Sequence, residues 1–287
     1  MERSVNTLGR WGLLAPEAEA LVTWFHAFTA SFADGDALSP LLELKRLHSF
    51  RVSTIARELA EALTWDDDEI RAAQTAGLLH DVGRFPQYAS FGTFYDGRSL
   101  DHGEKGRDVI ATEAPLAACS GETREALLQS VALHNKKALP ETIPLCALPL
   151  ARLIRDADKL DVFHIVHRHV QEGRITQLLP GIDETGPLSH ALVREVENAH
   201  LASYANVRSL ADFLLVQLTW VFDLNYPPSL ERLRKTGIVE DIAIRVEKGH
   251  TAVRRLIADA WERLENPRSL LREEQLGKKT LTAPPEQ

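Results

Sequence analysis

The segment Leu78-Leu79-His80-Asp81-Val82-Gly83 puts a histidine and an aspartate side by side at the end of a predicted helix. Asp66 and Glu69 have the spacing of a capping box, which predicts that this helix begins there and ends near Asp81. His80 continues the apolar stripe of the helix and is therefore expected to face the interior. A buried imidazole or carboxylate costs several kcal/mol unless it has a partner. His80 and Asp81 therefore need polar or charged partners from elsewhere in the chain.

Three further histidines continue apolar stripes, each on a different predicted helix: His48, His102 and His134. A fifth predicted helix carries the acidic run from Asp156 to Asp161. Neutral nitrogen donors and anionic oxygens that converge from separate helices are what a divalent metal requires. Any one histidine on an apolar stripe is more often a hydrogen-bonded core residue than a ligand. Five such features on five helices together favour a metal site.

Helical periodicity dominates the rest of the chain, and strand alternation is scarce. Pro16 fits the first turn of a helix that runs to about residue 32, and Ser39 with Pro40 forms an N-cap and first-turn pair for the next helix. The segment from Gly83 to Arg98, rich in glycine and aromatic residues, is expected to be an ordered loop. Later helices are expected at about residues 101–113, 122–136, 146–172, 188–200, 209–224, 228–248 and 250–265.

These patterns predict an all-α fold in a single domain. We expect an N-terminal helical segment at residues 1–39, a metal-binding core at 40–172, C-terminal helices packed on that core at 173–276 and a flexible tail at 277–287. An apolar run at residues 214–221 is broader than a single stripe. It predicts a helix that is buried on most sides, either in the core or in a contact between the subunits of a homo-oligomer.

The composition is that of an ordinary globular protein, since 44% of the 287 residues are hydrophobic and 26% are charged. The formal net charge of −8 argues against a protein that coats duplex nucleic acid. Neither a leader sequence nor an apolar run long enough for a membrane span is recognisable, so we expect a cytoplasmic protein. Cys119 and Cys146 form no Cys-x-x-Cys pair and are expected to be buried residues of a reducing compartment.

The order of His48, the His80-Asp81 pair and the segment Asp156-Ala-Asp-Lys-Leu-Asp161 resembles the HD superfamily of metal-dependent phosphohydrolases. The resemblance covers about residues 40–170 and implies an HD-type helical bundle that holds one or two divalent metals. It implies that the first metal is bound by His48, His80, Asp81 and Asp158. His102 and His134 are similar to the extra histidines of members with two metals, and Asp81 would then bridge both ions. The alternative is that these two histidines donate to a substrate phosphate beside one metal.

The ligand within the acidic run is chosen from two candidates. Asp156 and Asp158 lie about 200° apart around a helix, so only one of them faces a given site. Each of them lies at helical spacing from several apolar residues, so periodicity does not decide which one faces the site. The family pattern, in which a basic residue and a leucine follow the ligand, resembles Asp158-Lys159-Leu160 and favours Asp158 over Asp156.

The resemblance implies hydrolysis of a phosphate ester by a metal-activated water, with Asp81, Arg84 and Lys136 as catalytic candidates. Arg84 and Lys136 each lie just beyond a proposed ligand and would neutralise charge on phosphoryl oxygens. The expected cofactor is one or two ions of manganese, iron, magnesium, nickel, cobalt or zinc, and mixed nitrogen and oxygen donors favour transition metals over magnesium. The Gly-Tyr-Pro motif of the branch that cleaves cyclic dinucleotides does not occur. The expected substrate is a nucleotide or another small phosphate ester.

Two other functions are compatible with the same residues. A few relatives in this superfamily resemble the chain in their ligands yet activate dioxygen, which implies a di-iron oxygenase as an alternative. A binding or regulatory protein that keeps the metal scaffold without turnover is a third hypothesis. The intact ligand positions argue against it, because a pure binding protein has no need of all of them.

Overall fold

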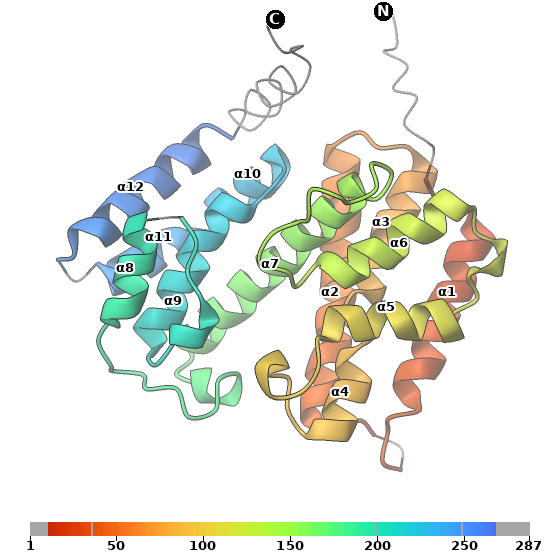
Figure 1. The fold of residues 1–287 in the computed structure, drawn as a ribbon, viewed down its shortest axis with the longest axis horizontal. Helices are drawn as coiled ribbons and strands as arrows, with labels where there is room; N and C mark the ends of the chain where they lie inside the picture. The colour runs from red at the N-terminus through yellow and green to blue at the C-terminus, as the bar shows by residue number, and fades with distance from the viewer. Residues whose placement is uncertain (1–10, 36, 199, 248, 268–287) are drawn as a thin grey trace, which may run out of the picture. The chain divides into compact units, whose positions relative to one another are not determined.

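The computed structural model describes residues 11–35, 37–198, 200–247 and 249–267. Within these residues the chain is helical, and its β-structure is limited to isolated bridges such as the one between Asp34 and Ala37. The predicted all-α fold is therefore confirmed (Figure 1). The tail predicted at residues 277–287 lies outside the described residues.

The chain divides into two compact units, Met1–Asp161 and Val162–Gln287, and the division falls within one long helix. That helix, α7, spans Leu148–Gln171. All the predicted ligands lie in the first unit. The expected packing of the C-terminal helices on the core at residues 40–172, within one domain, stays a prediction.

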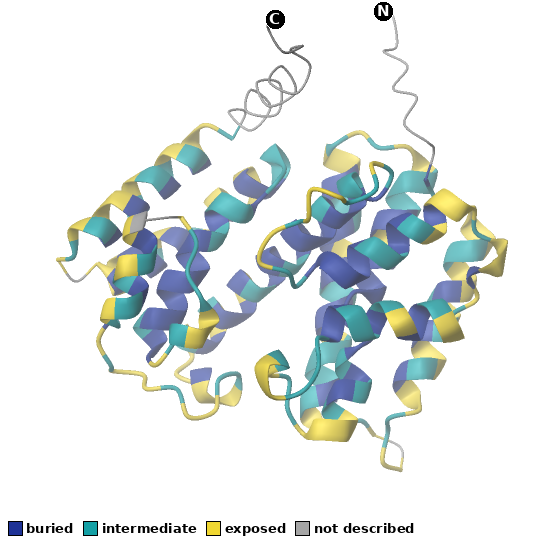
Figure 2. Ribbon diagram, in the orientation of Figure 1, coloured by how far each residue is buried: buried dark blue, intermediate teal, exposed yellow. Residues whose placement is uncertain are grey.

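The first unit is a helical bundle that consists, in chain order, of α1 (Ala15–Ala30), α2 (Pro40–Ala62), α3 (Asp67–Leu79), α4 (Arg84–Phe91), α5 (His102–Glu113), α6 (Gly121–Leu133) and the first part of α7. Helix α2 packs along α3, α5 packs on α6, and α1 packs against α3. Two 3₁₀ turns, η1 (Asp96–Arg98) and η2 (Leu116–Ala118), follow α4 and α5. Most residues of α7 between positions 150 and 161 are buried, as the dark blue of this helix shows in Figure 2.

The helices of the core begin where the sequence signals predict. The hydroxyl of Ser39 accepts a hydrogen bond from the backbone N–H of Leu42 at the start of α2. Asp66 and Glu69 form the predicted capping box of α3. His48 is only 2% exposed, so the inner stripe of α2 does carry this imidazole into the interior.

The segment from Gly83 to Arg98 is half helical, so the loop expected there is wrong for residues 84–91. Pro86 lies in the first turn of α4, where its missing N–H costs no helical hydrogen bond. Phe85 is fully buried, so an aromatic side chain that suggested a loop anchors a helix instead. Glycine is needed at position 83, because a Cβ there would lie 2.1 Å from the carbonyl oxygen of His102. The start of α4 is therefore in close contact with the start of α5.

The second unit contains the rest of α7 together with α8 (His190–Asn198), α9 (Leu210–Thr219), α10 (Pro227–Lys235), α11 (Ile238–Val246) and α12 (Thr251–Glu265). Helix α9 packs against α11 and is buried along nearly its whole length, as its broad apolar run predicts. The single helix expected at residues 228–248 is wrong, because Gly237, with φ at 70°, separates α10 from α11. This left-handed conformation favours glycine and interrupts a helix.

The two cysteines are more exposed than the sequence predicts. Cys119 and Cys146 are free thiols, but they are half-buried rather than buried. Both lie in connecting segments rather than on the inner face of a helix, which explains their partial exposure. Among the described residues, none of the helices has the length and apolar character needed to cross a bilayer.

Candidate metal centre

The predicted ligands converge in the first unit, although they come from separate helices. They are His48 on α2, His80 and Asp81 directly after α3, His102 at the start of α5, His134 directly after α6, and Asp158 on α7. The four histidines are between 0% and 3% exposed. Asp158 is 22% exposed, so solvent reaches the cluster beside this carboxylate.

One group of donor atoms surrounds a single oxygen of Asp81. The Nε2 atoms of His48 and His80 lie 3.2 Å apart, and each is 3.6 Å from Asp81 Oδ2. Asp158 Oδ1 lies 3.1 Å from His48 Nε2 and 3.7 Å from His80 Nε2. Asp158 is thus the acidic residue beside these histidines. Asp156 is fully buried and belongs to none of the clusters that could hold a metal in the described part of the chain.

A second group of donor atoms surrounds the other oxygen of Asp81. The Nε2 atoms of His102 and His134 lie 3.0 Å apart, and they are 3.5 Å and 3.6 Å from Asp81 Oδ1. The carboxylate of Asp81 therefore stands between two pairs of imidazoles, with one pair at each oxygen.

One histidine of each pair is held by the helix that it follows. His80 Nδ1 donates a hydrogen bond to the carbonyl oxygen of Gly77 at 2.8 Å, and His134 Nδ1 donates to that of Val131 at 2.7 Å. A carbonyl oxygen only accepts, so Nδ1 carries the proton in both rings. The Nε2 atom of each neutral ring then presents a lone pair toward Asp81.

The other histidine of each pair is held by a carboxylate. His48 Nδ1 lies 2.6 Å from Asp161 Oδ2, and Arg51 Nε donates to the second oxygen of Asp161 at 2.8 Å. His102 Nδ1 lies 2.6 Å from Asp96 Oδ2. A carboxylate that accepts from Nδ1 fixes the ring orientation and leaves Nε2 as the donor atom, which is the usual support of a metal-binding histidine.

The two Nε2 atoms of each pair lie only 3.2 Å and 3.0 Å apart, so they repel each other when neither carries a proton. A proton on one ring, or a cation bound by both rings, removes this repulsion. Burial lowers the pKa of His80 to about 3 and that of His102 to about 4, which keeps these rings neutral near pH 7. Burial also lowers the pKa of His48, but Asp158 and Asp161 outweigh it and raise that pKa overall. His48 is therefore the ring of these three that holds a proton most tightly, and a metal bound to its Nε2 would have to displace that proton.

The distances and charges of the cluster fit divalent cations. Two ligands that each lie about 2.1 Å from one ion are about 3.0–3.4 Å apart in octahedral or tetrahedral arrangements. The contacts described above, from 3.0 Å to 3.7 Å, are close to that spacing. Burial raises the pKa of Asp81, but the ammonium of Lys45 and other nearby cations outweigh it and hold that pKa well below its usual range. Asp81 is therefore an anion in contact with four imidazole rings.

Asp96 is a site residue that the sequence reasoning missed. Besides its contact with His102, its Oδ1 accepts hydrogen bonds from Arg84 Nη1 at 2.9 Å and from Gln87 Nε2 at 2.8 Å. Asn135 Nδ2 donates to Asp96 Oδ2 at 3.2 Å. Asp96 thus connects one histidine of the centre to α4 and to the residue after His134. It lies in η1, a 3₁₀ turn between helices, where no periodicity could have indicated its role.

Lys45 is the second residue that was missed, and Arg84 is a predicted one that lies beside it. Lys45 Nζ donates to Asp81 Oδ2 at 2.8 Å, and Arg84 Nε lies 3.4 Å from Asp81 Oδ1. Both oxygens of Asp81 therefore face a cationic side chain as well as an imidazole pair. The spacing of three residues between Lys45 and His48, nearly one helical turn, is the sequence signal that could have found Lys45.

Lys136, predicted as a catalytic cation, lies in a different ion-pair cluster. Its ammonium donates to Asp101 and lies 3.2 Å from Glu104 Oε1. These two carboxylates neutralise it, and its role in phosphoryl transfer stays a prediction.

The two carboxylates that support His48 and His102 provide a matched pair of variants. Asp161→Asn is expected to weaken metal binding by about 10- to 100-fold at the His48 side, and Asp96→Asn by a similar factor at the His102 side, because each amide is a poorer acceptor for Nδ1–H. Calorimetric titration of each metal-free variant with Mn²⁺ measures the change in metal affinity. The two variants should weaken different binding steps. Equal binding curves for both variants and the unaltered protein would contradict this support role.

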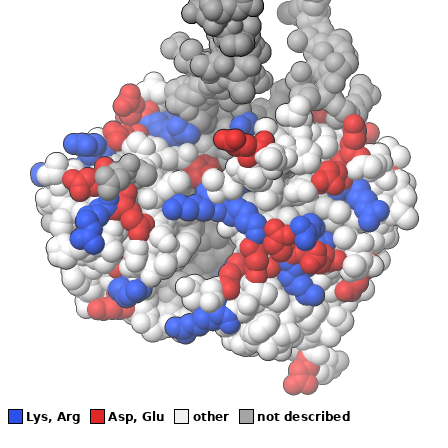
Figure 3. Space-filling model, viewed as in Figure 1, with Lys and Arg blue, Asp and Glu red and all other residues white. Residues whose placement is uncertain are grey.

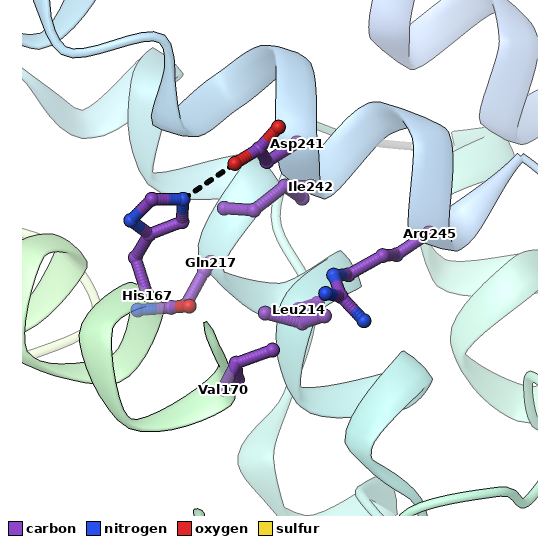
Figure 4. A pocket seen from close by; sticks show the side chains of 7 residues that line it. All are labelled: His167, Val170, Leu214, Gln217, Asp241, Ile242 and Arg245. Atoms are coloured by element: carbon purple, nitrogen blue, oxygen red, sulfur yellow. Dashed lines mark hydrogen bonds and ion pairs between the residues drawn. The ribbon is translucent and has the colours of Figure 1, made fainter. Parts of the chain in front are cut away.

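A histidine cluster on α7 in the second unit forms no comparable centre. His167 Nε2 lies 2.6 Å from Asp241 Oδ2 (Figure 4). Gln171 Nε2 donates to the same oxygen at 3.4 Å. The cavity that His167 and Asp241 border has a volume of about 10 Å³, which is room for one water at most. His164 is exposed, and His169 Nδ1 donates to the carbonyl oxygen of Ile165.

Comparison with known proteins identifies the class of the first unit. Residues 47–162 match the family model of the HD domain, and this segment contains all the predicted ligands. This segment of the chain is therefore an HD domain, the domain of the HD superfamily of metal-dependent phosphohydrolases that the sequence motifs resemble. No curated protein and no solved structure matches the chain.

Proposed function

We propose that the chain is a two-metal phosphohydrolase that cleaves a nucleotide or another small phosphate ester. The observation that supports this proposal is the position of Asp81, whose two oxygens each face a separate pair of Nε2 atoms. In this proposal one ion would be held by His48, His80, Asp81 and Asp158, and the other by Asp81, His102 and His134.

Divalent ions at these positions would supply a water of lowered pKa and would neutralise charge on the phosphoryl oxygens. The protein itself contributes the orientation of the donor atoms. Asp161 and Asp96 keep the Nδ1 protons on His48 and His102, so that each Nε2 stays available. The cluster is thereby organised before a substrate binds, and this organisation costs nothing at the moment of reaction.

The substrate would approach the part of the cluster that solvent reaches. Asp158 is 22% exposed, Lys45 17% and Arg84 15%, whereas the histidine rings are nearly inaccessible. Lys45 and Arg84 add positive charge beside Asp81, where phosphoryl oxygens would lie. A small anionic substrate agrees with this distribution.

Elemental analysis followed by a phosphate-release screen tests the proposal. Metal-free protein is loaded with Mn²⁺, Fe²⁺, Co²⁺, Ni²⁺, Zn²⁺ or Mg²⁺ and offered nucleotides and simple phosphate esters. We expect about two metals per chain and metal-dependent release of phosphate. Consumption of dioxygen without phosphate release from any ester would reject the proposal in favour of a di-iron oxygenase. Tight nucleotide binding without turnover over hours would instead favour a binding protein.

His134→Gln is expected to lower the metal content from about two ions to about one. The substitution removes an Nε2 donor only from the group at Asp81 Oδ1 and leaves His48, His80 and Asp158 intact. Elemental analysis after gel filtration measures the change, with His164→Gln, at an exposed position, as the control. A metal content equal to that of the unaltered protein would reject the two-metal centre.

The same proposal includes a cytoplasmic location and no binding to duplex nucleic acid. On the face shown in Figure 3, Lys and Arg side chains are interspersed with Asp and Glu side chains. Such a mixture supports a small ligand over a long polyanion, which binds to extended basic surfaces. Assembly as a homo-oligomer stays a further prediction.

A further inference from the structure

Lys45 and Arg84 contact opposite oxygens of Asp81 and share one aromatic neighbour. Lys45 Nζ lies 5.7 Å from the ring centroid of Phe94, and Arg84 Cζ lies 5.8 Å from it. The aromatic ring attracts both cations and limits where they can move. Two cations, one carboxylate and one half-buried ring therefore form a compact group at the solvent-accessible side of the centre.

The two cations differ in how many of their donors are already used. Arg84 Nη1 donates to Asp96 Oδ1, to the carbonyl oxygen of Phe94 and to Gln87 Oε1. Lys45 Nζ has one hydrogen-bond acceptor in the described part of the chain, the Oδ2 atom of Asp81. An ammonium carries three N–H donors. Lys45 therefore has donors left for a ligand. Arg84 is held in place through its Nη1, and its buried Nε has no hydrogen-bond acceptor among the described residues.

The position of Lys45 relative to the metal ligands indicates what kind of ligand this would be. The oxygen that accepts from Lys45 also faces the Nε2 atoms of His48 and His80. On the proposed function, a divalent ion bound there would share this oxygen with the ammonium. The single charge of Asp81 offsets only part of the repulsion between two positive groups so close together, and a second anion in contact with both would offset more of it. An oxygen of a phosphoryl group is such an anion.

The charges around the centre favour one class of phosphate ester. Two divalent ions carry two more positive charges than the carboxylates of Asp81 and Asp158 neutralise. Lys45 and Arg84 add two further positive charges. The carboxylate of Asp96 neutralises one of the positive charges. The remaining excess suits the dianion of a phosphate monoester better than the single negative charge of a diester.

We propose that Lys45 is a catalytic residue that binds the phosphoryl group of the substrate, and that with Arg84 it makes the centre selective for phosphate monoesters over diesters. This inference rests on the proposed function. The competing interpretation is that Lys45 only balances the charge of Asp81 and so holds the ligands together.

Binding of inorganic phosphate to Mn²⁺-loaded protein separates these interpretations without relying on turnover. Lys45→Met is expected to keep about two metals and to weaken phosphate binding by about 10- to 100-fold, the range of a lost charge-assisted hydrogen bond. Arg57→Met on the same helix, where Arg57 is exposed and pairs with Glu61, should bind phosphate like the unaltered protein. Calorimetry measures the affinity and elemental analysis the metal content.

Kinetics with two model esters adds the test of selectivity. Lys45→Met should lower kcat/KM for p-nitrophenyl phosphate by about 10- to 100-fold and that for bis(p-nitrophenyl) phosphate by less than about threefold. If Lys45→Met does not fold, Lys45→Gln, which can still donate to Asp81, takes its place in both experiments.

Unchanged phosphate affinity, or an unchanged ratio between the two esters, would overturn the proposal. Loss of the metals in both lysine variants would also overturn it, since the role would then be structural. If the unaltered protein cleaves neither of these esters nor any substrate of the phosphate-release screen, the proposed function fails. The effect of the variants on phosphate binding then decides the role of Lys45 by itself.

Discussion

Asp81→Asn should remove both metals and reduce phosphate release by at least about a thousandfold. The Oδ2 atom of Asp81 faces His48 and His80, and its Oδ1 atom faces His102 and His134. An amide nitrogen carries hydrogens and no available lone pair, so the variant loses a donor on one side. It also loses the negative charge that both ions would share. A single substitution of nearly the same shape therefore disables both halves of the centre.

The measurement combines elemental analysis and kinetics on protein prepared in parallel with Asp108→Asn. Asp108 lies on α5, its side chain is 59% exposed, and it pairs with Arg107, so this control should keep its metals and its activity. Circular dichroism verifies that both variants are folded. An Asp81→Asn protein that retains two metals, or that hydrolyses esters at an undiminished rate, would contradict the bridging role.

Arg155→Met is expected to lower the free energy of unfolding by about 3 kcal/mol. Arg155 is 1% exposed, and its Nη1 atom donates to three carbonyl oxygens after α6, those of Leu133, His134 and Lys136, at 2.9 Å, 3.3 Å and 2.6 Å. A methionine fills much of the volume but satisfies none of these acceptors. The cation also stabilises the negative end of the α6 dipole.

Urea titration of metal-free protein, followed by circular dichroism, measures this loss, since bound metal would add its own stabilisation. Arg57→Met serves as the control, because an exposed ion pair within a helix contributes about 0.5 kcal/mol or less. Since Arg155 fixes the backbone of His134, the variant should also bind the metal at the His102 side more weakly. An unfolding curve identical to that of the unaltered protein would show that the three carbonyl contacts contribute little.

The sequence predicts well which side chains converge at the centre, because they lie on regular helices or directly after them. His48 is a single polar residue on an otherwise apolar stripe, and the His80-Asp81 pair directly follows a helix with a recognisable cap. Their inward direction follows from the period of the helix. Periodicity could not choose between Asp156 and Asp158, because both positions are buried or half-buried on a helix that has few exposed residues in this stretch. The family resemblance favoured Asp158, the one that lies beside the histidines.

The residues that were missed act through contacts that a helical pattern does not encode. Asp96 reaches His102 from a 3₁₀ turn, and its position depends on the buried side chain of Gln87, which also donates to the carbonyl oxygen of Leu100. Lysine is usually a surface residue. Only the tertiary structure reveals that the ammonium of Lys45 contacts Asp81. The break at Gly237 was overlooked because a single glycine within a helical pattern is often tolerated.

Anomalous diffraction from crystals grown with Mn²⁺ tests the central claim most directly. We expect two peaks in the anomalous difference map, about 3.5–4 Å apart, one beside Asp81 Oδ2 with His48 and His80, and one beside Asp81 Oδ1 with His102 and His134. A metal-loaded crystal whose peaks all lie away from Asp81, with the imidazole pairs still in contact and unoccupied, would contradict it.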